Sequence, residues 1–212
     1  MLCRLYFYTR SGLPVGTRAS ARSYYEGMRD FVINGLRVTA GGAGEELSGD
    51  IAVVCDFSRP IDLVAEARGE KNMLGEICAL SEKSDLTLVF GTEVLVFGER
   101  RLSAVIAHRG ALADVADGCS VSSPYVAAKT VKIYRVGSVK FAVLLGGDAR
   151  VGFIMKKIAS ACDFAVAVEP EPSSGSSARV KYLSAKLSLP VLYVSPSETF
   201  FAGAQLYRNT LS

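Results

Sequence analysis

The fold class of this chain is decided by one stretch of sequence, Ser138-Val139-Lys140-Phe141-Ala142-Val143-Leu144-Leu145-Gly146-Gly147-Asp148-Ala149-Arg150. Its apolar run from Phe141 to Leu145 shows no polar alternation, which is typical of a strand buried on both faces of a sheet. A glycine pair ends the run, and apolar residues follow at helical spacing from 151 to 161. The stretch therefore predicts a buried strand, a tight turn and a helix, as in an α/β fold.

The same alternation extends in both directions along the chain. Apolar runs bounded by turn residues predict strands at 2–8, 51–55, 86–90, 93–97, 101–107, 131–136, 139–145, 164–168, 191–194 and 204–207. Apolar residues at helical spacing predict helices at 19–36, within 60–84, at 151–161 and at 180–187. Gly98, Gly110 and Gly137 lie between consecutive strands, as hairpin turns require. We expect an α/β protein with mixed β-sheets flanked by helices, in one domain spanning 1–212.

Composition narrows the classes of function. The 212 residues carry a net charge of +3 without a long basic run, which argues against nucleic acid as a partner. No apolar run has the length of a bilayer span, so we expect no membrane partner. The five cysteines are widely spaced and odd in number. They predict no metal site, redox motif or cofactor, and they favour a reducing, cytoplasmic location. The segment 169–177 is rich in Pro, Ser and Gly and predicts a solvated loop.

Three segments follow one another in a distinctive order: Gly49-Asp50-Ile51-Ala52-Val53-Val54-Cys55-Asp56, the stretch 138–150, and 161–168 with a helix and the strand 189–195 behind it. In this order they resemble the carbon–nitrogen hydrolase (nitrilase-like) family. The first is similar to the family's apolar strand ending in proline and the general-base glutamate. The second is similar to its nucleophile strand, and Asp148 and Arg150 match. The resemblance implies an αββα sandwich that pairs into homodimers or other homo-oligomers, truncated at the C-terminal end relative to the family.

The catalytic positions of that family fall on unlike residues in this chain. By resemblance, the glutamate position falls on Asp56, the lysine position near Asp117 or Gly118, and the cysteine position on Gly146. Amide cleavage by this route needs a thiolate that attacks, a carboxylate that manages its proton, and a cation beside the developing oxyanion. Glycine supplies no attacking atom. The resemblance therefore predicts a catalytically degenerate member that has lost the Glu-Lys-Cys triad and acts through binding, regulation or assembly.

Two further functions remain open. The first is a divergent amidohydrolase that cleaves a small amide with a relocated thiol. Cys119 is the candidate nucleophile because it lies close in sequence to the lysine position, and Asp56 would be the base. The second is a structural subunit that buries a sheet edge or its helices against a like or unlike partner.

The glycine turn also suggests a binding site. Gly146 and Gly147 would bare backbone N–H groups at the end of a strand, just before a helix. With Asp148 and Arg150 they form a candidate site for a small-molecule ligand such as an anion. Asp148 would repel an anion, however, and in the alternative interpretation it caps the helix that follows.

Overall fold

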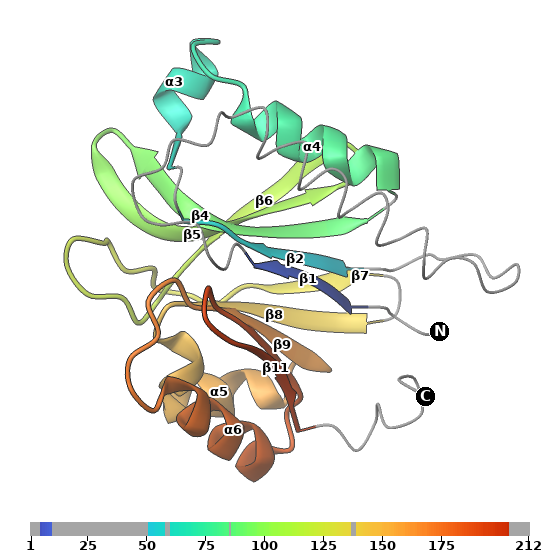
Figure 1. The fold of residues 1–212 in the computed structure, drawn as a ribbon, viewed down its shortest axis with the longest axis vertical. Helices are drawn as coiled ribbons and strands as arrows, with labels where there is room; N and C mark the ends of the chain where they lie inside the picture. Colours follow the sequence, from blue (N-terminus) through green and yellow to red (C-terminus); the bar gives the residue numbers. More distant parts are fainter. Residues whose placement is uncertain (1–4, 10–50, 58–59, 85, 137–138, 204–212) are drawn as a thin grey trace, which may run out of the picture.

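The computed structural model describes residues 5–9, 51–57, 60–84, 86–136 and 139–203. The predicted helix at 19–36, the predicted strand at 204–207 and the predicted turn at Gly137 lie outside the described residues. Within them the chain forms two stacked β-sheets with helices on both outer faces (Figure 1). This arrangement confirms the predicted fold class, an αββα sandwich of mixed sheets.

The first sheet joins a parallel half to an antiparallel half. Its strands β1 (Leu5–Thr9), β2 (Ile51–Cys55) and β4 (Thr87–Val96) are parallel, β3 (Ile61–Asp62) pairs with β4, and β5 (Glu99–His108) and β6 (Ala111–Asp117) follow as antiparallel hairpin strands. The hairpin turns place Gly98 at φ +84° and Gly110 at φ +81°. These conformations favour glycine, so the hairpin predictions at both positions are confirmed.

The second sheet is built around three buried parallel strands. These are β8 (Val139–Leu145), β9 (Phe164–Val168) and β10 (Val191–Val194), and the sheet is completed by the antiparallel edge strands β7 (Ile133–Val136) and β11 (Thr199–Ala202). The three central strands are continuous apolar runs because helices cover one face and the other sheet covers the opposite face. The deciding stretch is therefore correctly predicted as a buried strand that ends at Leu145, a tight turn at Gly146 and a helix that follows, Gly152–Ala159.

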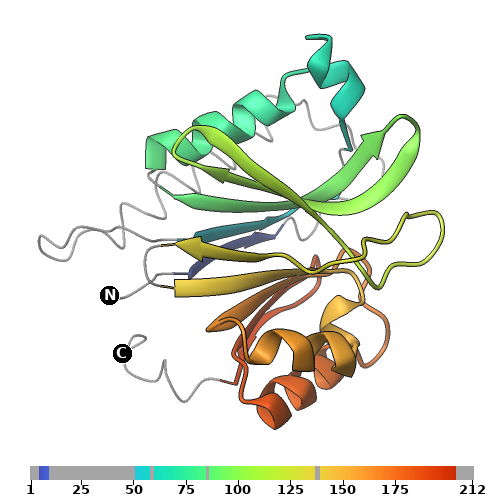
Figure 2. The same cartoon turned by 180° about the vertical axis from the view of Figure 1, so that it is seen from behind.

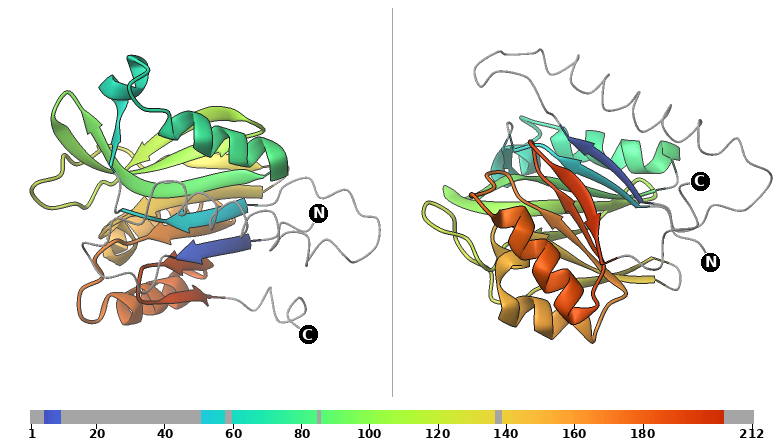
Figure 3. Two further views of the ribbon diagram at one scale, coloured as in Figure 1. Left: turned by 45° about the horizontal axis from the view of Figure 1, so that its top comes forward. Right: turned by 60° about the horizontal axis from the view of Figure 1, so that its bottom comes forward.

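The helices of the described residues cover the two outer faces, as Figures 2 and 3 show from three further directions. The first sheet is covered by α3 (Leu63–Ala67) and α4 (Met73–Ser84), and the second by the short 3-10 helix η2 (Asp148–Arg150), α5 (Gly152–Ala159) and α6 (Ser176–Leu187). Asp62 begins α3 by accepting the N–H groups of Val64 and Ala65, as an N-cap residue does. No helix of the described residues has both the length and the apolarity to cross a membrane.

The inner faces of the two sheets pack directly on each other. This inter-sheet core consists of apolar side chains from β2, β4, β5, β6, β8, β9 and β10, among them Val53, Val89, Leu102, Phe141 and Val166. Gly91, in the middle of β4, lets the sheets approach closely, because a Cβ on it would lie 2.6 Å from Val168 Cγ1. The two strands predicted at 86–90 and 93–97 are one continuous strand, because the pairing of β4 with β5 runs unbroken across Gly91.

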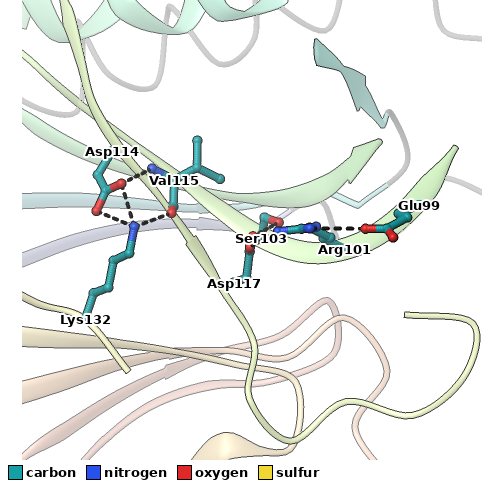
Figure 4. A network of polar contacts seen from close by, with 7 residues as sticks. All are labelled: Glu99, Arg101, Ser103, Asp114, Val115, Asp117 and Lys132. Atoms are coloured by element: carbon teal, nitrogen blue, oxygen red, sulfur yellow. Dashed lines mark hydrogen bonds and ion pairs between the residues drawn. The ribbon is translucent and has the colours of Figure 1, made fainter. Parts of the chain in front are cut away.

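The edges of the two sheets are joined by a polar cluster that the sequence did not predict. The carboxyl group of Asp114, on the edge strand β6, accepts from Lys132 Nζ at 2.7 and 2.9 Å (Figure 4). It also accepts from Tyr134 Oη at 3.1 Å. Lys132 directly precedes β7, the edge strand of the other sheet, and Tyr134 lies within it. The cluster therefore fastens one sheet to the other.

We expect Asp114→Asn to lower the free energy of unfolding by about 1 kcal/mol at neutral pH, because the pair is partly exposed and screened by water. Burial raises the pKa of Asp114, but hydrogen bonds from Lys132, the Val115 N–H and Tyr134 outweigh it and lower the pKa overall. A lowered pKa means that this stabilisation is present above the unfolded value and disappears as the pH falls below about 4. Urea unfolding at pH 7 and pH 3 measures both values. Glu99→Gln, in an exposed ion pair with Arg101, is the control. An equal loss at both pH values would contradict the assignment.

Candidate functional site

The three positions assigned by resemblance to a catalytic triad lie at one end of the sandwich. Asp56 follows β2, Gly118 follows β6 and Gly146 follows β8. A chain of contacts connects the first with the last: the Asp56 N–H donates to Gly91 O at 3.0 Å, Gly91 abuts Val168, and Val168 O accepts from the Gly146 N–H at 3.0 Å. The fold thus gathers these strand ends although the residues are up to 90 positions apart in sequence.

Asp56, the first residue in this series of contacts, is buried, with 4% of its surface exposed. Its neighbours Cys55 and Phe57 both pack into the inter-sheet core. Because side chains alternate between the faces of a strand, the inward positions at the end of β2 are occupied by a thiol and a phenyl ring. Asp56, whose carboxyl group is the candidate base, lies between these two residues in the sequence.

Gly146 occupies a tight turn between β8 and η2. Its φ is +56°, in the left-handed region that favours glycine. A Cβ at this position would lie 2.8 Å from Leu102 Cδ2 and 3.5 Å from Val121 Cγ1. The space that a nucleophilic side chain would need is therefore filled by apolar groups.

Gly118 is crowded by the same side chain. A Cβ on Gly118 would lie 2.8 Å from Val121 Cγ1 and 3.3 Å from Leu145 Cβ. Val121, from the loop after β6, therefore lies beside both the lysine position and the cysteine position. Asp117, the other residue near the lysine position, accepts from Ser103 Oγ at 2.6 Å and from Arg101 Nη1 at 3.1 Å (Figure 4).

Asp148 holds this loop against the glycine turn. Its carboxyl group, 1% exposed, accepts the N–H of Cys119 at 3.0 and 3.1 Å, the N–H of Ser120 and the N–H of Leu145 at 3.2 Å. Burial raises the pKa of Asp148, although the backbone hydrogen bonds act in the opposite direction. The interpretation of Asp148 as the cap of the following helix is wrong, because neither η2 nor α5 has a side-chain cap.

The backbone donors of the predicted anion site are engaged within the fold. The Gly146 N–H donates to Val168 O and the Gly147 N–H donates to Ser120 O at 3.1 Å. A Cβ on Gly147 would also lie 2.8 Å from Ser120 O. A ligand at Gly146 and Gly147 would have to displace these carbonyls, since a buried N–H makes its bond with what the fold provides.

Arg150 belongs to a second buried cluster, at the ends of β9 and β10. Its Nη2 lies 3.0 Å from Glu169 Oε1, and Tyr193 Oη donates to Glu169 Oε2 at 2.7 Å. Glu169 is 2% exposed. The prediction of a solvated loop from 169 is therefore wrong at its first residue, and also at Ser176, which is buried at the start of α6. The available signal was the position of Glu169 directly after the apolar run 164–168, which forms a buried strand.

The four cysteines that the structure describes show no sign of activation. Burial, and secondarily the charge of Asp56, raise the pKa of Cys55 to about 12, and burial raises that of Cys162 to about 11. The pKa of Cys78 is raised by burial. That of Cys119 is raised by burial and by the carboxylates of Asp148 and Asp117, although Lys157 opposes them. A reactive thiol requires the reverse shift.

A polar cluster missed by the sequence analysis lies near the outer end of β4. Glu93, 7% exposed, pairs bidentately with Arg100, with 2.8 Å from Nε to Oε1 and from Nη2 to Oε2. The guanidinium group also lies 5.5 Å from the centre of the Tyr125 ring. These contacts hold the loop that carries Val121 at Tyr125. Among the described residues, no three His, Cys, Asp or Glu side chains are arranged to hold a metal ion.

Comparison with known proteins identifies the architecture. The structure is similar to a carbon-nitrogen hydrolase from Helicobacter pylori G27, with a TM-score of 0.69 and 10% identity over 91% of this chain and 73% of that chain. The fold is that of the nitrilase superfamily. Saccharomyces cerevisiae Nit3, a member of branch 10 of the nitrilase superfamily, gives a TM-score of 0.68 at 11% identity, over 92% of this chain and 75% of its own. A mutant of the Nesterenkonia AN1 amidase gives 0.67 at 11%, over 91% and 76%.

The nitrilase-like fold is therefore established by structure, whereas the sequence has diverged far. Neither a protein-family model nor a curated protein matches the sequence. At 10% to 11% identity to these structures, the similarity shows the fold alone, and the chemistry of this protein depends on its own residues.

Proposed function

We propose that this protein uses the nitrilase-like fold for binding, regulation or assembly and does not hydrolyse amides through a thiol. The observation that carries the proposal is the glycine turn. At Gly146 there is no nucleophilic atom, and Leu102 and Val121 fill the adjacent space. The Nesterenkonia amidase, by contrast, is described with an active-site cysteine. Covalent catalysis cannot begin without the attacking atom.

The alternative, a divergent amidohydrolase, finds support in the position of Cys119. Its backbone lies beside the glycine turn, tied to Asp148. Burial, and after it the carboxylates of Asp148 and Asp117, raise the pKa of its thiol, however, which lowers the fraction of thiolate at neutral pH. The local electrostatics thus favour the binding role over the hydrolase.

An amidase assay distinguishes the two functions. The protein is incubated with butyramide, the ligand of a mutant Nesterenkonia amidase structure, and released ammonia is measured, with that amidase in its active form as the positive control. We expect no release above buffer. The variants Cys119→Ser and Cys162→Ser form a matched pair, since both thiols are half-buried and only the first adjoins the turn. Turnover that Cys119→Ser abolishes and Cys162→Ser preserves would establish the relocated thiol. Turnover that survives both substitutions would also overturn the proposal.

A further inference from the structure

The loop after β6, residues 118–132, carries the chain from the first sheet to the second (Figure 1). We call it the crossover loop. Its base is closed by a hydrogen bond from the Ala128 N–H to Gly118 O at 2.8 Å. Between these two residues, the stretch 122–124 is exposed, whereas Val121 is partly buried and packs against the inter-sheet core. Val121 is therefore turned inward from a part of the loop that otherwise faces solvent.

The inward side chain of Val121 lies beside two of the candidate catalytic positions. Its Cγ1 atom lies 2.8 Å from the position of a Cβ on Gly118 and 3.5 Å from that of a Cβ on Gly146. Leu102 Cδ2 and Leu145 Cβ, which also line these glycines, come from β5 and β8 and are fixed by the two sheets. The valine side chain is thus the part of this apolar lining that a loop supplies.

Polar contacts hold the crossover loop in this position from both sides of Val121. On the N-terminal side, the buried carboxyl group of Asp148 accepts the Ser120 N–H. On the C-terminal side, the Val126 N–H donates to Arg100 O at 2.9 Å. Backbone donors of a fold are costly to leave without an acceptor, so both contacts oppose lifting of the loop. The fold therefore keeps Val121 in place.

We propose that Val121 is an intramolecular plug, held against the two glycines by the crossover loop, and that it closes a pocket for a small neutral molecule with a short apolar end. The walls of this pocket are the side chains of Leu102 and Leu145. A charged ligand is a poor fit, because burying an unpaired charge among apolar groups is strongly unfavourable. The buried carboxyl group of Asp148 would in addition repel an anion when it is ionised.

This inference rests on the proposed function and deepens it, because a plugged site excludes small amides by shape as well as by the missing nucleophile. Amide turnover would overturn the proposed function whether or not ligands bind more tightly to an unplugged variant. Failure of the plug, by contrast, is measured by a binding titration and leaves the absence of turnover unaffected. The two failures are therefore distinguishable.

The test measures the thermal unfolding midpoint of the full chain at increasing concentrations of isobutyramide, whose isopropyl group matches the side chain of valine. Val121→Ala removes the methyl groups that close the pocket. We expect its midpoint to rise saturably, with an apparent Kd at least about tenfold lower than that of the wild-type protein, because a site that is mostly closed binds in proportion to its open fraction. Val121→Thr, which keeps the branched shape, is expected to respond like the wild-type protein.

Val105→Ala is the matched control. Val105 is fully buried in the core between the first sheet and α4, so the same truncation opens a space away from the crossover loop. We expect its response to isobutyramide to equal that of the wild-type protein. Each variant reports its own folding through its unfolding transition. Val121→Ser, whose short side chain tolerates water, repeats the test if the alanine variant does not unfold cooperatively.

Four outcomes would overturn the proposal. The first two are a midpoint of Val121→Ala that does not respond saturably and a wild-type response as strong as that of Val121→Ala. The third is a response of Val121→Thr equal to that of Val121→Ala, which would mean that the shape of the side chain does not close the pocket. The fourth is an equal response of Val105→Ala, which would mean that isobutyramide fills any truncated core.

Discussion

Replacing Asp148 with alanine is expected to lower the free energy of unfolding by about 3 kcal/mol or more, because three backbone N–H groups lose their acceptor and each unsatisfied buried group costs about 1–3 kcal/mol. These groups belong to Cys119, Ser120 and Leu145. The first two lie in the loop after β6 and the third at the end of β8. The substitution therefore also detaches the loop that carries Val121 from the glycine turn.

Urea unfolding of Asp148→Ala against the wild-type protein measures this loss, and Asp163→Ala is the matched control. Asp163 also accepts a backbone N–H, that of Lys140 at 2.7 Å, but in an exposed setting where water can replace it. We expect the control to cost about 1 kcal/mol or less. Similar losses in the two variants would show that Asp148 is not the clamp of this loop.

Glu169→Ala is expected to cost about 2–3 kcal/mol, because the buried Tyr193 Oη loses its acceptor and Arg150, whose side chain is 35% exposed, loses its carboxylate partner. Both partners lie in the layer between β9, β10 and α6. The Nη1 atom of Arg150 also donates to Ser173 Oγ at 2.9 Å, so the guanidinium group keeps one partner after the substitution.

The matched variant is Glu198→Ala, which removes a carboxylate from the exposed ion pair with Lys181. Exposed pairs contribute about 0–1 kcal/mol, so this variant should unfold close to the wild-type midpoint. Thermal unfolding of the two variants side by side measures the difference. If Glu169→Ala were as stable as Glu198→Ala, the cluster would not be an ion pair on which the fold depends.

The strands of the core were predictable because their burial is continuous. Runs such as 51–55, 139–145 and 164–168 are apolar at every position, and each is a strand in the structure. The strand β6 was missed because its sequence, Ala-Leu-Ala-Asp-Val-Ala-Asp, mixes carboxylates with small residues. Those carboxylates find cations in Lys132 and Arg101, at distances along the chain that no local pattern reveals.

Some positions of the candidate site were predictable from the sequence, but the side chains that pack around them were not. The order of strands and the Gly-Gly-Asp-x-Arg turn were sufficient to place Asp56 and Gly146 at strand ends, whereas Gly118 follows β6, which was not predicted. The sequence alone gave no indication that Val121 would pack against two of these positions. Likewise, Asp148 was assigned to its own helix, whereas its partners are 28 and 29 residues away. Contacts of this kind depend on how the two sheets stack.

The central claim, a nitrilase-like fold without thiol chemistry, is tested most directly by native labelling with iodoacetamide and mass-spectrometric assignment of the modified cysteines. The account predicts that Cys55, Cys78, Cys119 and Cys162 all react more slowly than free cysteine until denaturant is added, because burial or neighbouring carboxylates raise every one of their pKa values. Labelling of Cys119 faster than free cysteine in the folded protein would contradict it, and would mean that a nucleophile has been re-established beside the glycine turn.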